Sequence, residues 1–207
     1  MGSATFPGTN LWCVERRGAD WGPPVHVDGS ADATAMIYNP SITSDGTLYF
    51  SGVLPDGGAK NQLYRARLSV DHYHYMKPER LPFSDVRWNH MDPTVSPDDR
   101  FLVFASNRPG TIGSADLFIV FHPTDGTWTE PQSLGTGVNS EGLENAPVLG
   151  PDGHTLYYSS VRAVTARRFP KPREDASMVS ARLRSPDNGL RNLWFVDLSS
   201  WLATDAH

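Results

Sequence analysis

Cysteine is almost absent from this chain: Cys13 is the only one among 207 residues. A single cysteine cannot form an internal disulfide, so packing and hydrogen bonds must hold the fold together, and Cys13 is expected to pack as a small apolar side chain. Basic charge is scarce too, with 18 Lys and Arg against 23 Asp and Glu. This balance disfavours nucleic acid as a partner, because binding a phosphate backbone needs clustered positive charge.

Long apolar runs are also missing. No stretch approaches the roughly 20 apolar residues of a membrane-spanning helix, and none has the periodicity of a long helix. The N-terminal residues carry no charged-then-apolar signal peptide, so the sequence leaves the compartment unknown. Turn-forming residues are abundant instead, with 18 Gly and 17 Pro beside 11% aromatic residues, which indicates a turn-rich all-β domain.

One segment of the sequence occurs three times, 53 or 54 residues apart. Each copy runs from a proline through an aspartate turn into an apolar strand. The matching positions are Pro40, Pro93 and Pro147, then Asp45, Asp98 and Asp152, then Phe50, Phe104 and Tyr158. A period near 50 residues with about four short strands predicts the blades of a β-propeller, whose strands we letter a to d from the channel outward.

A second apolar pair follows each copy and extends the repeat to a fourth, N-terminal position. The pairs are Leu11-Trp12, Leu63-Tyr64, Leu117-Phe118 and Leu193-Trp194. They divide a single domain, residues 1–207, into blade fragments at about 8–32, 33–84, 85–140 and 141–198. The first fragment supplies strands c and d, the next two are complete, and the last supplies a, b and c.

About three and a half blades are therefore present, whereas closed propellers have about four to eight. The simplest interpretation is an N-terminally truncated six-bladed propeller, and a small four-blade closure is the alternative. Open blade edges would allow self-association. Strands are expected near 41–44, 48–52, 62–68, 94–96, 101–106, 116–121, 147–149, 155–160 and 192–198, with almost no helix. Phe50, Phe104 and Tyr158 should be buried between adjacent sheets.

The copy that begins at Pro93 carries a family resemblance. Ser106-Asn107-Arg108-Pro109-Gly110, Asp116-Leu117-Phe118 and the segment Trp128–Asn139 resemble the TolB-like, PD40-type (WD40-like) propeller repeat. The resemblance covers almost all of the chain except an inserted loop at about 162–190. It implies a propeller fold, and relatives of this type are often periplasmic or exported and bind proteins. In one turn Asp99 replaces the usual glycine, as Asp tolerates a positive φ.

Polar residues gather in the d–a and b–c loops, which a propeller places on one rim of its channel. The candidate binding residues are Asn89, His90, Asp92, Arg108, Asn139, Glu141, Glu144 and Arg162. His90 and Glu144 hold equivalent blade positions, as do Arg108 and Arg162. The alternative for these residues is structural: strand capping, bonds between blades, or pairing of the arginines with carboxylates of the chain. The short turns at Asp45, Asp98 and Asp152 are expected to be structural only.

Two other features are weaker signals. The loop at about 162–190 is rich in arginine and is either a mobile insertion or a basic flap over the same rim. His72 and His74 alternate like a metal-binding pair, but no third ligand lies nearby in the sequence, so no metal site is predicted.

Two functions are compatible with this pattern. The first is a non-catalytic recognition module without a cofactor, which binds a peptide, a protein or a small polar ligand at the channel rim. The second is a propeller-type glycoside hydrolase or lyase that uses rim carboxylates, His and Arg. The motifs Gly-x-Ser-x-Gly, His-Glu-x-x-His and Cys-x-x-Cys are absent, which favours the first. An accessory domain of a larger peptidase is a third possibility, which the natural-looking C-terminal strand disfavours.

Overall fold

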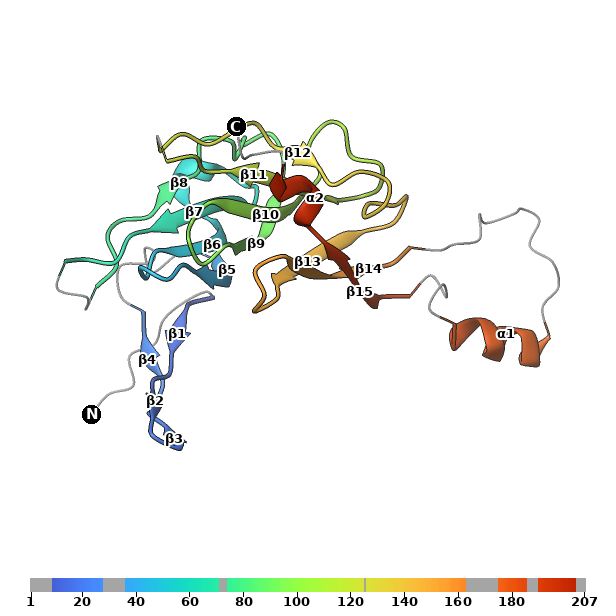
Figure 1. The fold of residues 1–207 in the computed structure, drawn as a ribbon, viewed down its shortest axis with the longest axis horizontal. Coiled ribbons are helices and arrows are strands. Elements are labelled where there is room, and N and C mark those ends of the chain that lie inside the picture. The colour runs from blue at the N-terminus through green and yellow to red at the C-terminus, as the bar shows by residue number, and fades with distance from the viewer. Residues whose placement is uncertain are drawn as a thin grey trace.

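The computed structural model describes residues 9–27, 36–70, 74–124, 126–162, 175–185 and 190–203. These residues form antiparallel sheets, two with four strands and one with three, and a two-part N-terminal hairpin (Figure 1). Within each sheet every strand pairs with the next one along the chain. No helix among the described residues has the length and hydropathy to cross a membrane.

The strands of the three sheets follow the repeat. The first sheet contains β5 (Met36–Ile42), β6 (Leu48–Val53), β7 (Gln62–Ala66) and β8 (Glu79–Arg80), with a 3₁₀ turn at Pro55–Gly57. The second contains β9 (His90–Val95), β10 (Phe101–Ser106), β11 (Asp116–Phe121) and β12 (Gln132–Ser133). The third contains β13 (Glu144–Leu149), β14 (Thr155–Ser160) and β15 (Asn192–Asp197). All nine expected strands are present, which confirms the all-β prediction.

The innermost strands β5, β9 and β13 begin three to five residues earlier than the sequence suggested. Each contains a β-bulge, where the register shifts at the residue before the proline. These residues, Asn39, Asp92 and Ala146, have φ angles of 54°, 55° and 50°. Proline has no N–H to donate to the ladder, so a bulge lets the strand continue through it. As a result His90, Asp92 and Glu144 lie within strands, and the prediction that placed them in the d–a loops was wrong.

The N-terminal hairpin has the hydrogen bonding of strands c and d of a blade. Its main ladder joins β1 (Trp12–Cys13) to β4 (Val25–His26), and its tip joins β2 (Arg16–Arg17) to β3 (Asp20–Trp21). The Val27 N–H donates to the Leu11 carbonyl at 3.0 Å. The same bond recurs from Leu81 to Leu63 and from Leu134 to Leu117, at 2.9 and 3.1 Å. Leu11-Trp12 is therefore the fourth repeat position in space as well as in sequence.

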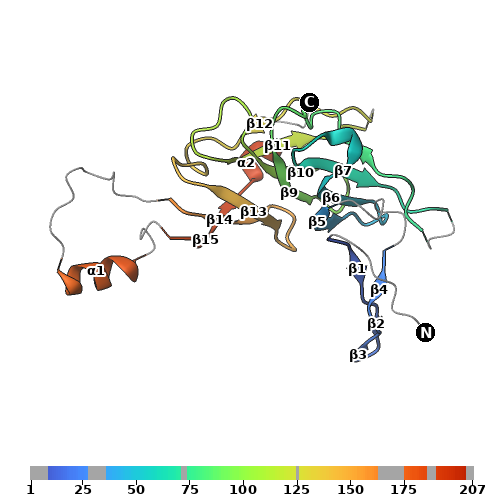
Figure 2. The ribbon, with the colours of Figure 1, turned by 180° about the vertical axis from the view of Figure 1, so that it is seen from behind.

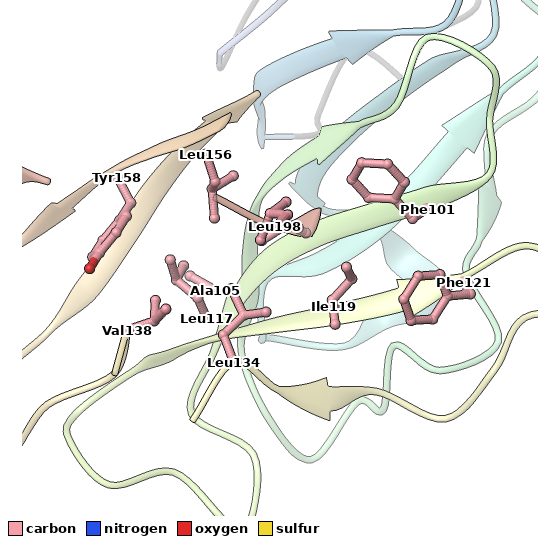
Figure 3. Close-up of a cluster of buried hydrophobic side chains, with 11 residues drawn as sticks. Phe101, Ala105, Leu117, Ile119, Phe121, Leu134, Val138, Leu156, Tyr158 and Leu198 are labelled. Carbon is pink, nitrogen blue, oxygen red and sulfur yellow. The ribbon is translucent and has the colours of Figure 1, made fainter. Parts of the chain in front are cut away.

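Apolar side chains fill the spaces between successive sheets. One cluster joins the hairpin to the first sheet, a second joins the first and second sheets, and a third joins the second and third sheets (Figure 3). Phe50, Phe104 and Tyr158 are buried in these clusters, one in each, on the side that faces the preceding sheet. The prediction of three equivalent buried aromatics is confirmed.

Two short helices complete the described structure. Helix α1 (Ala176–Leu183) lies in the inserted segment that the sequence predicted as a loop, set apart from the sheets in Figure 2. Helix α2 (Ser199–Leu202) follows β15, and its Trp201 and Leu202 pack against the third cluster. Eight residues make barely two helical turns, too few for a periodicity signal in the sequence.

Candidate functional site

The three innermost strands line an open groove where the channel of a propeller would lie. The groove has a volume of about 490 Å³. Its walls come from the same four positions in each inner strand, with three residues of the a–b turns: Asn39–Ile42, Asp92–Val95, Ala146–Leu149, Pro97, Gly150 and Pro151. In Figure 1, β5, β9 and β13 meet at the centre of the arrangement.

Asp92 ties the three inner strands together at one end of the groove. Its carboxylate accepts hydrogen bonds from the Asn39 side-chain amide and from the Ala146 N–H, the second at 2.9 Å. Its own N–H donates to the Ser51 hydroxyl at 2.8 Å. Asn39 and Ala146 occupy the equivalent bulge positions of the neighbouring strands. Both carboxylate oxygens are therefore occupied by the chain itself, and Asp92 orders the groove.

Further along the strands, side-chain hydroxyl groups also link neighbouring inner strands by hydrogen bonds. Ser41 accepts a hydrogen bond from the Val95 N–H at 3.0 Å, and Thr94 accepts one from the Leu149 N–H at 3.1 Å. These bonds satisfy backbone groups that would otherwise face the channel unpaired. In the third sheet Val148 stands at this position and offers no hydroxyl. Apart from Asp92, the groove wall carries no ionisable side chain, and aliphatic side chains and five prolines line it.

His90 is fully buried beside the inner strands, not exposed at the rim. Its Nε2 accepts a hydrogen bond from the Asp85 N–H at 3.1 Å, and its ring packs edge-on against Phe104. Burial, and then the nearby charge of Arg108, lower the pKa of His90 to about 4. The imidazole is therefore neutral at physiological pH. Ile37 holds the same position in the first sheet.

Glu144 occupies the position of His90 in the third sheet, since His90 pairs with Ser106 and Glu144 with Ser160. It too is fully buried. Its carboxylate accepts hydrogen bonds from the Ser140 N–H at 2.9 Å, the Ser140 hydroxyl at 2.6 Å and the Ser160 hydroxyl at 2.5 Å. These donors compensate for the lost hydration of a buried carboxylate. The equivalence seen in the sequence is real, and the contacts are those of a strand-capping residue.

The two arginines lie over aromatic rings of strand c. The guanidinium carbon of Arg108 is 5.7 Å from the Phe118 ring centre, and that of Arg162 is 4.8 Å from the Trp194 ring centre. Arg162 also donates to the Val138 carbonyl. Neither forms an ion pair with a carboxylate of the described residues, so the predicted structural pairing with Glu144 or a nearby Asp is replaced by cation–π stacking. Burial lowers the pKa of Arg108.

The remaining candidates divide between structural and exposed positions. The Asn139 side chain bonds both backbone groups of Leu117, at 2.8 and 3.0 Å. Asn89 accepts a hydrogen bond from the Asn61 N–H at 3.1 Å. Glu141 is exposed. Of the eight candidates, Asp92 alone lines the groove. The sequence missed Ser41, Ile42 and Val148, although their fixed offset after each repeat proline marks them as channel-facing.

The aspartate turns hold their own backbone. Asp152 accepts hydrogen bonds from Thr155 and His154, and the Thr155 bonds are the main cause that lowers its pKa to about 2. Asp99 has a φ of 62°, so it takes the left-handed conformation that glycine takes in the other two turns. It also accepts a hydrogen bond from Tyr49 of the preceding sheet at 2.7 Å. These turns therefore contribute contacts between sheets as well as local geometry.

Metal binding finds no support in the part of the chain that the structure describes, where no group of three His, Cys, Asp or Glu side chains comes together. His72 lies outside the described residues, as does most of the arginine-rich segment between 162 and 190.

Comparison with known proteins places the fold. No protein-family model and no curated protein matches the chain. Among solved structures, 86% of the chain aligns with a structure assigned to TolB from Agrobacterium tumefaciens, with 18% identity, a TM-score of 0.50 and 50% of that chain covered. TolB from Acinetobacter baumannii gives 14% identity, a TM-score of 0.44 and coverages of 85% and 32%. The tricorn protease gives 15% identity, a TM-score of 0.41 and coverages of 75% and 13%.

The sheets, their order around a groove and this likeness define an all-β protein with a TolB-like propeller fold. The described sheets form an arc and do not close into a ring. At 18% identity the likeness shows the fold alone, and the chain spans half the length of the TolB structure from Agrobacterium tumefaciens.

Proposed function

We propose that this chain is a non-catalytic recognition module that binds an extended peptide or protein segment in the groove between β5, β9 and β13. The observation that carries the proposal is the groove itself, lined by equivalent positions of three sheets. We also infer that the repeat is of the PD40 type, which the matching register of the three copies supports.

The chemistry of the groove wall suits a peptide better than a charged small molecule. Asp92 is the only ionisable residue of the wall, and both of its oxygens already accept hydrogen bonds from the chain. Ile42 and Val148 expose 57% and 59% of their surface along the wall. Apolar side chains of a ligand can be buried there, which is the main source of binding free energy in such grooves. Asn89, Arg108 and Glu141 are proposed to contact a ligand where it leaves the groove toward the rim loops.

The catalytic alternative is less well supported by the contacts. A glycoside hydrolase needs one carboxyl group that donates a proton and a second that attacks or activates water. Asp92 and Glu144 are each held by donors of the chain, and Glu144 is fully buried. His90 is also buried and its pKa is far below neutral, so it is poorly suited to exchange a proton with a ligand at pH 7.

The groove can be tested with a displayed library of random peptides, selected on the intact chain. We expect Ile42→Asp to weaken binding of the selected peptides at least about tenfold, since it places a charge against the buried apolar part of the ligand. Val70→Asp is the matched control, because Val70 is 98% exposed and lies outside the groove. Failure to select any peptide, or equal binding to both variants, would contradict the proposal.

A further inference from the structure

One face of the third sheet carries an exposed apolar patch, the open face, formed by Val148, Tyr157, Leu193 and Phe195. Their exposed fractions are 59%, 41%, 75% and 73%. Val148, Tyr157 and Phe195 are in register across β13, β14 and β15, and Leu193 lies two residues before Phe195 on the same side. Four large apolar side chains on one side of one sheet form a continuous surface, which is unusual for a protein that remains alone in water.

Most of the same positions in the other sheets are buried by the sheet that follows. In the second sheet they are Val103, Leu117 and Ile119, all fully buried against the third sheet. In the first sheet Tyr49 and Leu63 are fully buried against the second. The open face therefore has the composition and position of a surface that packs between blades, where such residues are otherwise covered.

The chain also carries the complementary kind of surface at its N-terminal hairpin. Leu11 matches Leu193 in the repeat, so Trp12 and Val14 match Trp194 and Val196, which pack against the second sheet. Trp12 contacts His26 edge-on and is still 54% exposed, and Val14 is 47% exposed. Within the chain, Leu117 and Ile119 of the second sheet pack in one cluster with Trp194 and Val196 of the third. By the same matching, Leu193 and Phe195 of one copy can pack against Trp12 and Val14 of another.

We propose that the open face binds the N-terminal hairpin of a second copy of this chain, head to tail, and that two such contacts close a twofold dimer. Both β15 and β1 occupy the strand c position, so they cannot complete one blade and must pack face to face as successive blades. The absence of a hydroxyl at Val148 agrees with this arrangement. At the matching positions, the Ser41 and Thr94 hydroxyls accept hydrogen bonds from the inner strand of the next sheet. The described part of the hairpin has no inner strand, so no such hydroxyl is needed at Val148.

A dimer is the assembly that ring geometry allows. The described residues of each copy supply three sheets and the hairpin, so two copies bring together about eight such units, at the upper end of the range of about four to eight blades in closed propellers. A third copy would exceed that range. A head-to-tail contact that failed to close would grow without limit, whereas a closed ring stops at two.

Sedimentation velocity over a wide concentration range tests the proposal on the full chain, whose mass is 22.8 kDa. We expect a concentration-dependent dimer and no larger species. Phe195→Glu and Val14→Glu should each abolish the dimer, because each places a charge in an apolar contact. Val70→Glu, at a position that is 98% exposed and belongs to neither surface, should leave the dimer unchanged. All three positions are exposed, and thermal unfolding checks that the variants remain folded.

Mixing the two disruptive variants distinguishes this geometry from other dimers. A mixed pair keeps one intact contact, between Phe195 of the Val14→Glu chain and Val14 of the Phe195→Glu chain, so some dimer should return. A monomer at every concentration, a dimer that survives either substitution, no recovery on mixing, or growth without limit would each overturn the proposal. None of these outcomes depends on whether a peptide binds in the groove.

Discussion

Replacing Phe104 by alanine removes the aromatic ring at the centre of the contact between the first and second sheets. Phe104 is fully buried, and its ring lies 5.4 Å from that of Phe83, 6.0 Å from that of Phe118 and 5.7 Å from that of His90. Its strand is paired on both sides, by β9 and β11, so the backbone has little freedom to move inward and fill the space.

The expected loss of stability is about 3–5 kcal/mol, which combines the lost transfer free energy of the ring with the cost of the cavity. For a two-state domain this loss would shift the midpoint of urea unfolding without changing the denaturant slope. Trp21→Ala is the control, since Trp21 is 66% exposed at the hairpin tip and should cost less than about 1 kcal/mol. A loss below about 1 kcal/mol for Phe104→Ala would show that the sheets do not pack through this residue.

Two further outcomes are expected. The folded pKa of His90, about 4, lies below its ordinary 6.5, so only the unfolded chain gains a proton as pH falls between these values. The His90 contribution to stability is thus complete above pH 6.5 and should fall by about 2 kcal/mol between pH 7 and pH 5. A His90→Gln variant whose urea unfolding has the same pH dependence as that of the unsubstituted chain would refute this. Asp92→Ala should lower the free energy of unfolding, measured with urea, by about 2–4 kcal/mol, because hydrogen bonds are lost and alanine tolerates a positive φ poorly. Asp92→Asn should lower it by less.

The repeat made the sheets predictable from the sequence, because three copies share one spacing and one turn. Once Phe104 is assigned to a strand facing the preceding sheet, Phe50 and Tyr158 follow at the matching positions. The boundaries of the inner strands were less accessible, since a proline near the start suggests that the strand begins there. The bulges at Asn39, Asp92 and Ala146 are tertiary features that the pattern does not reveal.

The candidate site was harder to predict, because a polar residue in the sequence does not indicate which group its side chain will contact in the fold. His90 and Glu144 have loop-like neighbours in the sequence, yet the chain buries both and satisfies them internally. Arg108 was expected to pair with a carboxylate, but its guanidinium lies over the aromatic ring of Phe118. The groove is built from ordinary strand residues such as Ile42, whose role appears only when three sheets are placed side by side.

NMR titration of the isotope-labelled chain with a selected peptide tests whether the peptide binds along the inner strands. We expect the largest shifts at the amides of Ser41, Thr94 and Val148, which lie at matching positions of the three strands. Ile42→Asp should abolish these shifts and Val70→Asp should not. Shifts confined to the outer strands β8 and β12, with none along the groove, would show that the peptide does not bind to the inner strands.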